Sequence, residues 1–117
     1  MEAIWLKKPE EHDYPAAQDY LELVMTTQAA KAKVSLLKKA PVIEKKAKDI
    51  FRASKLPLLP KDNRHVGDNL KKFKKGKKLS PLLLVRGDEA LIIADGYHRL
   101  CASYYLSEDL VIPCKLV

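Results

Sequence analysis

The stretch that decides the fold runs from Ala90 to Ala102 and reads ALIIADGYHRLCA. Its first four residues are apolar and include two isoleucines, which predicts a short buried strand. From Leu100 onward apolar residues recur at helical spacing, so we expect the chain to turn from strand to helix at Asp95 and Gly96. Glycine permits such a sharp turn and lets a ligand approach the backbone closely.

The start of this predicted helix has the features of an anion site. Tyr97, His98 and Arg99 fall in its first turn, where backbone N–H groups have no partner inside the helix and the helix dipole is positive. His98 and Arg99 would add charge-assisted donors. The simpler interpretation makes Asp95 an N-cap, Gly96 a turn residue and Arg99 a solvated side chain, and the local sequence supports both equally.

Length and composition indicate one globular domain. A chain of 117 residues with 47% hydrophobic residues is long enough to bury a core. No apolar run approaches the length of a membrane span, and residues 1–8 lack the order of a signal peptide, so we expect no membrane partner and a cytoplasmic location. Cys101 and Cys114 are expected to be free and buried, as is usual in a reducing compartment.

The formal net charge of +7 favours anionic partners. Many of the positive charges are lysines between residues 71 and 78. This run fits a nucleic-acid surface or a nucleotide site, and it equally fits a solvated helix face. Aromatic residues are not interleaved with the lysines, and the sequence has no zinc or helix-turn-helix motif, so nucleic acid stays the weaker alternative.

The first half of the chain is predicted to be mainly helical. We expect helices beginning at Asp13, which would act as a cap, over residues 28–39 after a cap at Thr26 or Thr27, and over residues 42–54. In the second helix the inward face is predicted to hold Ala29, Ala32 and Leu36, with Leu37 as a further candidate. Residues 3–6 form a short apolar run that suits an edge strand or a docking arm.

The second half alternates helix and strand. An extended segment over residues 56–60 precedes a predicted helix over 65–75, which Gly76 closes. Strands over 82–85 and 90–94 flank a tight turn, and a last strand over 110–117 contains Pro113, which favours an edge position. The expected fold is α/β (α+β): a small mixed sheet with packed helices in one domain, residues 1–117, with a helical segment 1–55 and an α/β core 56–117.

Residues 56–117 resemble the ParB/sulfiredoxin superfamily, which includes the ParB-like nuclease and N-terminal domain fold. The resemblance rests on the proline-rich segment, the helix that ends at Gly76, the run Leu79–Val85 and the Gly96, Arg99 and Ala102 spacing. It implies a nucleotide-phosphate loop. Members of this superfamily bind CTP or use ATP, so the resemblance implies ATP or CTP with Mg²⁺ as the ligand. The contacting residues would be Gly96, Tyr97, His98 and Arg99.

Departures from the superfamily narrow the expected activity. Tyr97 stands where sulfiredoxins have their catalytic cysteine, so sulfiredoxin activity is disfavoured. ParB proteins continue into a DNA-binding domain, which this sequence does not show. An NTPase or small-molecule phosphotransferase remains, with Asp95 and His98 as catalytic candidates. Further carboxylates that could serve lie in loops, at Asp62, Asp88 and Glu89.

The alternative is a basic domain with a degenerate site that binds nucleic acid or another protein. No metal-ligand set is predicted, and the other two histidines, His12 and His65, are expected to be surface residues without a functional partner. The sequence sets no oligomeric state.

Overall fold

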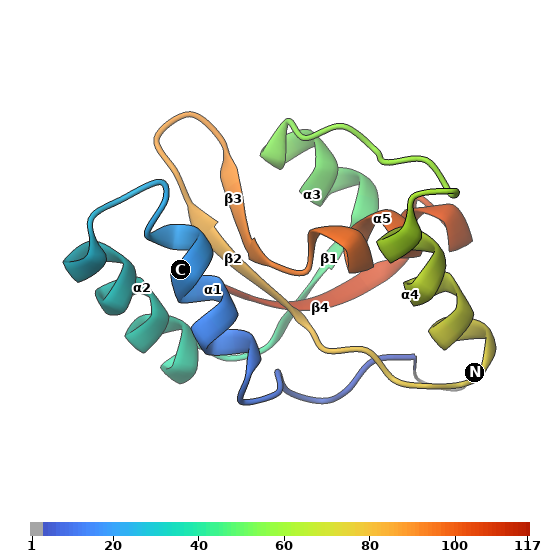
Figure 1. The fold of residues 1–117 in the computed structure, drawn as a ribbon, viewed down its shortest axis with the longest axis horizontal. Helices are drawn as coiled ribbons and strands as arrows, with labels where there is room; N and C mark the ends of the chain where they lie inside the picture. Colours follow the sequence, from blue (N-terminus) through green and yellow to red (C-terminus); the bar gives the residue numbers. More distant parts are fainter. Residues whose placement is uncertain (1–3) are drawn as a thin grey trace.

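A mixed four-stranded sheet forms the centre of the fold in the computed structural model, which describes residues 4–117 (Figure 1). The strand order is β1-β4-β2-β3. β2 and β3 form an antiparallel hairpin, β4 runs parallel to β2, and β1 pairs antiparallel with β4. The strands are β1 (Ile43–Lys46), β2 (Leu82–Arg86), β3 (Leu91–Asp95) and β4 (Val111–Leu116).

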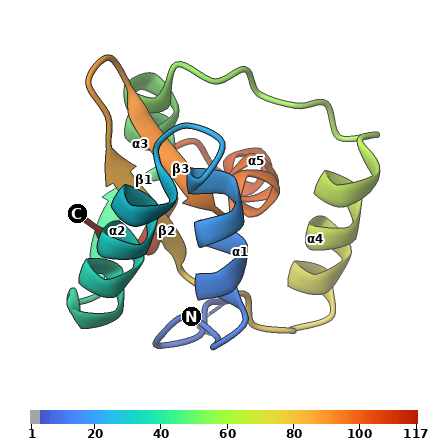
Figure 2. The same cartoon turned by 60° about the vertical axis from the view of Figure 1, so that its left-hand side comes forward.

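The structure has five helices within residues 4–117: α1 (Asp13–Leu21), α2 (Thr27–Lys39), α3 (Ala47–Ser54), α4 (Arg64–Lys74) and α5 (Tyr97–Leu106). Alternate residues of β2 point to opposite faces. Leu83 and Val85 pack under α1 and α2, and Leu82 and Leu84 pack against α3 and α5. Figure 2 shows α4 at the outside of the molecule, reached from α3 by an extended connection, and its buried residues Val66 and Phe73 face α5. The predicted α+β class with a small mixed sheet is therefore confirmed.

The predicted helix over residues 42–54 is wrong in its first part. Residues 43–46 form the strand β1, in which Ile43 lies opposite Cys114 and packs into the core. The helix begins only at Ala47, whose N–H donates to the Leu110 carbonyl, while the Lys48 N–H donates to the Glu108 carbonyl. Pairing with β4 thus overrides the local helical pattern and also provides partners for the first N–H groups of α3. The first half of the chain supplies one strand of the sheet and cannot be separated from the α/β core.

The predicted edge position of the last strand is also wrong, because β4 lies between β1 and β2. Pro113 is tolerated there although it lacks an N–H. The register with β2 begins at Cys114, one residue later, and on the other side Pro113 lies opposite Glu44. Pro113 is compatible with the interior position of β4 because it precedes Cys114, the first residue of β4 that pairs with β2.

The helices of the first half differ in detail from the expectation. Thr26 caps α2 by accepting from the Ala29 N–H, as predicted. Asp13 does not cap α1; its carboxylate accepts from the Glu10 N–H instead. α2 packs against α1 and β2 with Ala30, Val34 and Leu37, so the candidate Leu37 is inward, whereas Ala29, Ala32 and Leu36 are not buried. The predicted inward residue Leu36 is 51% exposed.

Several predictions of the second half are confirmed. α4 ends before Gly76, which has a φ of 75°, and the β2–β3 turn is closed by the Gly87 N–H donating to the Ala90 carbonyl. Both cysteines are free and buried. Of the predicted arm, Ala3 lies outside the described residues, and Trp5 forms an isolated parallel bridge with Leu79. None of the helices in residues 4–117 is both long and apolar enough to cross a membrane.

Candidate functional site

A cavity of about 310 Å³ opens at the start of α5, between α5 and α4. The residues that line it come from two segments of the chain. They are His65, Asp68, Asn69 and Lys72 from α4, and Asp95, Gly96, Tyr97, His98 and Arg99 from the end of β3 and the first turn of α5. All four residues predicted to contact a ligand, and both catalytic candidates, therefore line one cavity. Lys72 belongs to the lysine run that was predicted to suit a nucleotide site, whereas the other α4 residues of the lining were missed, because no sequence motif connects them to the α5 turn.

Gly96 makes the sharp turn into α5. Its φ is +110°, and a Cβ at this position would lie 2.8 Å from Leu82 Cγ and 2.9 Å from Arg99 Nη2. Its carbonyl accepts from the Leu100 N–H, which starts the helical ladder. The N–H groups of the first turn have no acceptor within the helix, and they lie at the positive end of its dipole. The prediction that glycine is needed for the sharp turn is therefore confirmed, and the close approach of a ligand to its backbone stays a prediction.

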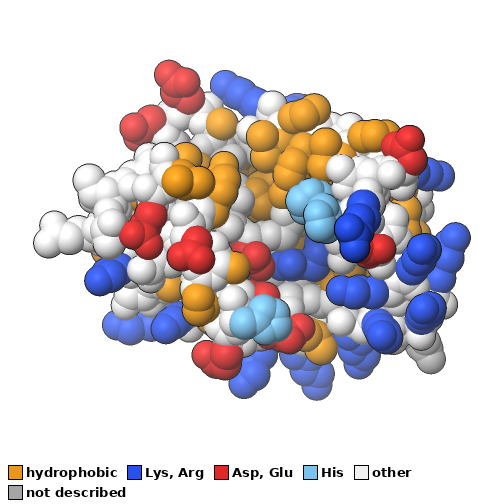
Figure 3. Space-filling view, viewed as in Figure 1, with side chains coloured by type: hydrophobic (Ala, Val, Ile, Leu, Met, Phe, Trp, Pro, Cys, Tyr) orange, Lys and Arg blue, Asp and Glu red, His pale blue; other side chains and the backbone are white. Residues whose placement is uncertain are grey.

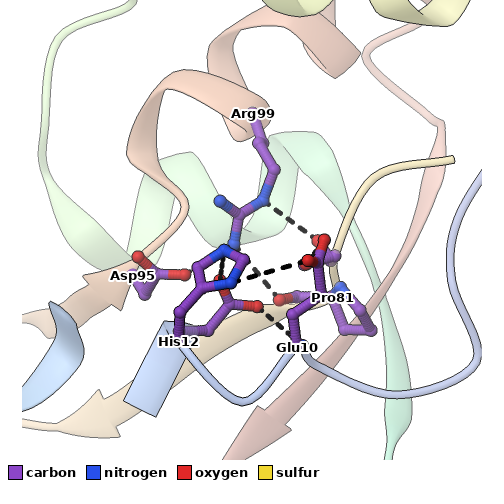
Figure 4. A network of polar contacts seen from close by, with 7 residues as sticks. Glu10, His12, Pro81, Asp95 and Arg99 are labelled. Atoms are coloured by element: carbon purple, nitrogen blue, oxygen red, sulfur yellow. Dashed lines mark hydrogen bonds and ion pairs between the residues drawn. The ribbon is translucent and has the colours of Figure 1, made fainter. Parts of the chain in front are cut away.

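Arg99 is engaged inside the protein. Its Nε donates to the Ser80 carbonyl at 3.0 Å, and its Nη2 donates to the Pro81 carbonyl at 3.3 Å and to Asp95 Oδ2 at 2.8 Å. Figure 4 shows the guanidinium between Asp95 and Pro81. Both partners of the ion pair are only 17% exposed. Arg99 therefore ties the end of β3 and the start of α5 to the segment that enters β2.

This arrangement corrects two interpretations of the sequence. Asp95 is not an N-cap, because α5 has no side-chain cap and Gly96 occupies the cap position. Arg99 is not a solvated side chain either, because a guanidinium that is this buried requires acceptors. Burial raises the pKa of the Asp95 carboxyl, and the adjacent Arg99 guanidinium opposes that rise. Asp95 thus serves first as the partner of Arg99.

A polar network continues from Arg99 toward the N-terminal segment. The Ser80 hydroxyl donates to Glu10 Oε1 at 3.2 Å, and His12 lies 3.6 Å from Glu10 and 3.4 Å from Asp13 (Figure 4). A second cavity of about 250 Å³ lies on this side. Its lining includes Glu10, His12, Asp13, Lys77 and Lys78, and it shares Asn69, Lys72 and Arg99 with the first cavity. Arg99 therefore stands between two adjacent polar cavities, of which the sequence indicated only one.

Two histidines meet in the wall of the α5 cavity. The ring centroids of His65 and His98 lie 4.8 Å apart, and the Tyr97 ring lies 5.6 Å from that of His98. Partial burial lowers the pKa of His98, and His65 adds to this effect. The Tyr97 hydroxyl donates to the Pro57 carbonyl at 2.5 Å, and burial raises its pKa. The cavity thus presents a neutral His98 imidazole at pH 7. His65 is exposed, as expected, but its ring contacts that of His98.

The remaining candidates lie elsewhere. Asp62 is in the connection before α4, and Asp88 and Glu89 are in the β2–β3 turn; none of the three lines the α5 cavity. In the part of the chain that the structure describes, no group of three or more His, Cys, Asp or Glu side chains is arranged to hold a metal ion.

Comparisons of this chain with family models, with curated proteins and with solved structures find no match. The superfamily resemblance therefore stays a prediction.

Proposed function

We propose that this protein binds a nucleotide or another phosphate ligand in the α5 cavity, as a ParB/sulfiredoxin-like protein. The observation that carries the proposal is the composition of the cavity wall. The first turn of α5 and the side chains of Lys72, His65 and His98 line the same space. Backbone N–H groups at a helix start, an ammonium group and imidazole donors are all groups that bind phosphate oxygens.

The two acidic side chains in the lining differ in their effect on this ligand. The Asp95 carboxylate is paired with Arg99. Asp68 is exposed, so solvent and salt screen its charge, and it lies one helical turn before Lys72 on α4. Arg99 contributes its positive charge at the boundary of the cavity and fixes the α5 turn, which is a positioning role.

The cavity volume sets how a nucleotide would fit. A volume of about 310 Å³ is at the small end of ligand sites, which span about 300 to 1,000 Å³. The phosphates of ATP or CTP would occupy the cavity, and the nucleoside would lie over its rim. Mg²⁺ would be held mainly by phosphate oxygens and water, as is usual for this ion. That mode requires no cluster of protein ligands.

Among the catalytic candidates, His98 suits an NTPase or phosphotransferase better than Asp95. Its imidazole lines the cavity and is neutral at pH 7, which is the form that accepts a proton. Phosphoryl transfer depends mainly on positioning and charge neutralisation, which Lys72 and the α5 turn would supply. Sulfiredoxin chemistry is not part of the proposal, since Tyr97 holds no thiol and Cys101 is fully buried.

A thermal-shift screen of inorganic phosphate, ATP, CTP, GTP and ADP, with and without Mg²⁺, tests the proposal. A ligand at 100 times its Kd stabilises the folded state by about 2.7 kcal/mol, which raises the Tm by about 10 °C for a chain of this length. The variant Lys72→Ala should lose most of this shift. Lys71→Ala is the matched control, because Lys71 is the adjacent exposed lysine of α4 and lies outside the cavity. No shift with any of these ligands would refute phosphate binding.

A basic surface beside the site supports the second candidate, nucleic-acid binding. Lys77 and Lys78 line the second cavity together with Lys72, and Figure 3 shows lysine and arginine side chains gathered on the side of the molecule that holds α4. Binding through such a surface would weaken steeply with salt. Fluorescence anisotropy of labelled DNA and RNA at increasing salt measures this. If neither DNA nor RNA binds at low salt, nucleic-acid binding is ruled out.

A further inference from the structure

The contact between His65 and His98 joins two helix starts. His65 is in the first turn of α4 and His98 is in the first turn of α5, and their ring centroids are 4.8 Å apart at an interplanar angle of 52°. Both rings line the α5 cavity. The positive end of the α5 dipole disfavours a charged imidazole at His98, and because the rings are close, a proton on one ring disfavours a proton on the other.

The charged and titratable groups that face the pair come from both helices. α4 contributes Asp68 and Lys72 to the cavity, and the β3–α5 turn contributes Asp95, Tyr97 and Arg99. Asp95 is bound to Arg99, and the Tyr97 hydroxyl is bound to the Pro57 carbonyl in the connection from α3. Lys72 and Arg99 add positive charge near the rings. Asp68, which is exposed, is the carboxylate in this lining that has no partner among the described contacts.

We propose that the α5 cavity binds a doubly charged oxyanion, such as a terminal phosphate group, together with one proton that the His65–His98 pair takes up. The inference rests on the proposed function and adds the charge state of the ligand and its dependence on pH. A dianion within hydrogen-bond distance stabilises the imidazolium form, because it supplies the acceptor and the opposite charge that the empty cavity lacks. One proton is taken up rather than two, since the rings are close enough to repel when both are charged.

The affinity for the dianion should rise as the pH falls. In the free protein, partial burial and then the neighbouring His65 lower the pKa of His98. The bound dianion raises the proton affinity of the pair. At pH values between the pKa of His98 in the free protein and the higher pKa in the complex, the ligand affinity rises as the pH falls, by up to about tenfold per pH unit for one proton.

Sulfate is the probe, because it keeps its charge of −2 across the range in which phosphate itself titrates. Isothermal titration calorimetry of the wild type at pH 7.5 and pH 6.0 should give a Kd that falls by about 3-fold to 30-fold on acidification. At a fixed pH, the apparent enthalpy measured in buffers of different ionisation enthalpy should report uptake of up to one proton. His98→Gln should remove most of both effects, and His65→Gln should reduce them. His12→Gln is the matched control, because His12 lies in the neighbouring cavity and should leave both effects intact.

Three results would decide against the inference. Sulfate binding with the same Kd at both pH values overturns it and leaves the proposed function standing. A pH dependence of sulfate binding that is retained in full in both His98→Gln and His65→Gln also overturns the inference. Because His65 is exposed, His65→Gln should fold normally and gives an informative result even if His98→Gln folds poorly. If neither sulfate nor inorganic phosphate binds at any pH, the proposed function fails and the inference fails with it.

Discussion

Replacing Gly96 by alanine tests whether the turn from β3 into α5 depends on glycine. The residue has a φ of +110°, a conformation that L-amino acids rarely adopt. The added Cβ would lie 2.8 Å from Leu82 Cγ and 2.9 Å from Arg99 Nη2, both shorter than normal contact distances. Leu82 is fully buried and Arg99 is held by three acceptors, so neither side chain can move away freely.

The expected destabilisation has two parts. The left-handed backbone costs about 1–2 kcal/mol for a residue with a Cβ. Steric overlap in a packed site costs about 1–3 kcal/mol more. Unfolding entropy is about 2.1 cal/mol/K per residue, so a domain of this length loses about 4 °C of Tm for each kcal/mol. Gly96→Ala should therefore lower the Tm by about 8 to 20 °C.

Thermal unfolding followed by circular dichroism measures this, with two other glycines as controls. Gly76 has a φ of +75°, but a Cβ there would meet no atom within 4 Å, so Gly76→Ala should show only the backbone part, about 4 to 8 °C. Gly67 lies inside α4, and a Cβ there would lie 3.6 Å from the Lys61 carbonyl oxygen, an ordinary contact distance. Gly67→Ala should therefore stabilise the helix by about 0.5–1 kcal/mol. A Gly96→Ala variant as stable as Gly76→Ala would refute the steric argument.

Three further variants test the framework of the site. Asn63→Ala removes the cap that accepts two N–H groups at the start of α4, and it should cost about 1 kcal/mol in urea unfolding; no change would mean that water replaces the cap. Arg99→Ala should cost about 3 kcal/mol at neutral pH, because it leaves the Asp95 carboxylate partly buried without its partner. Burial already raises the pKa of Asp95 above its unfolded value, so the Arg99→Ala variant should lose stability as the pH rises through the pKa of Asp95 in the folded state. Acidification, or the additional substitution Asp95→Asn, should restore the stability. A stability that does not change with pH would contradict this. Lys115→Met removes the ammonium that donates to the Lys38 carbonyl at 3.1 Å in the last turn of α2, and it should lower stability by about 1–2 kcal/mol, whereas an unchanged urea midpoint would show that this bond contributes nothing.

The sequence predicts those parts of the fold whose signals are local. β2, β3 and α5 follow from short apolar runs, a change of hydrophobic period and the glycine at residue 96, and the structure has all three. β1 was missed because only its first residue, Ile43, packs into the core, and the strand exists through pairing with β4, more than half the chain later. The interior position of β4 was missed because Pro113 usually marks an edge, and only the register with β2 shows why it is accommodated.

The candidate site shows the same division. The α5 turn was predicted from its own residues, and it lines a cavity. The internal role of Arg99 could not be predicted, because two of its acceptors are backbone carbonyls, those of Ser80 and Pro81, and carbonyls leave no mark in the sequence. The contact between His65 and His98 joins residues on different helices, so it depends on how α4 packs against α5.

During synthesis on a ribosome, the β2–β3 hairpin and α5 can form as soon as they emerge, because their contacts are close along the chain. β1 cannot, since it is paired only with β4, and that partner is translated much later. Residues 47–110 separate the two strands, so β1 stays unpaired while this segment is translated. Three of its four residues, Glu44, Lys45 and Lys46, are charged, and charged side chains protect a lone strand from pairing with neighbouring chains. The charged residues that make β1 difficult to predict from its sequence therefore also disfavour its pairing with other chains before β4 is translated.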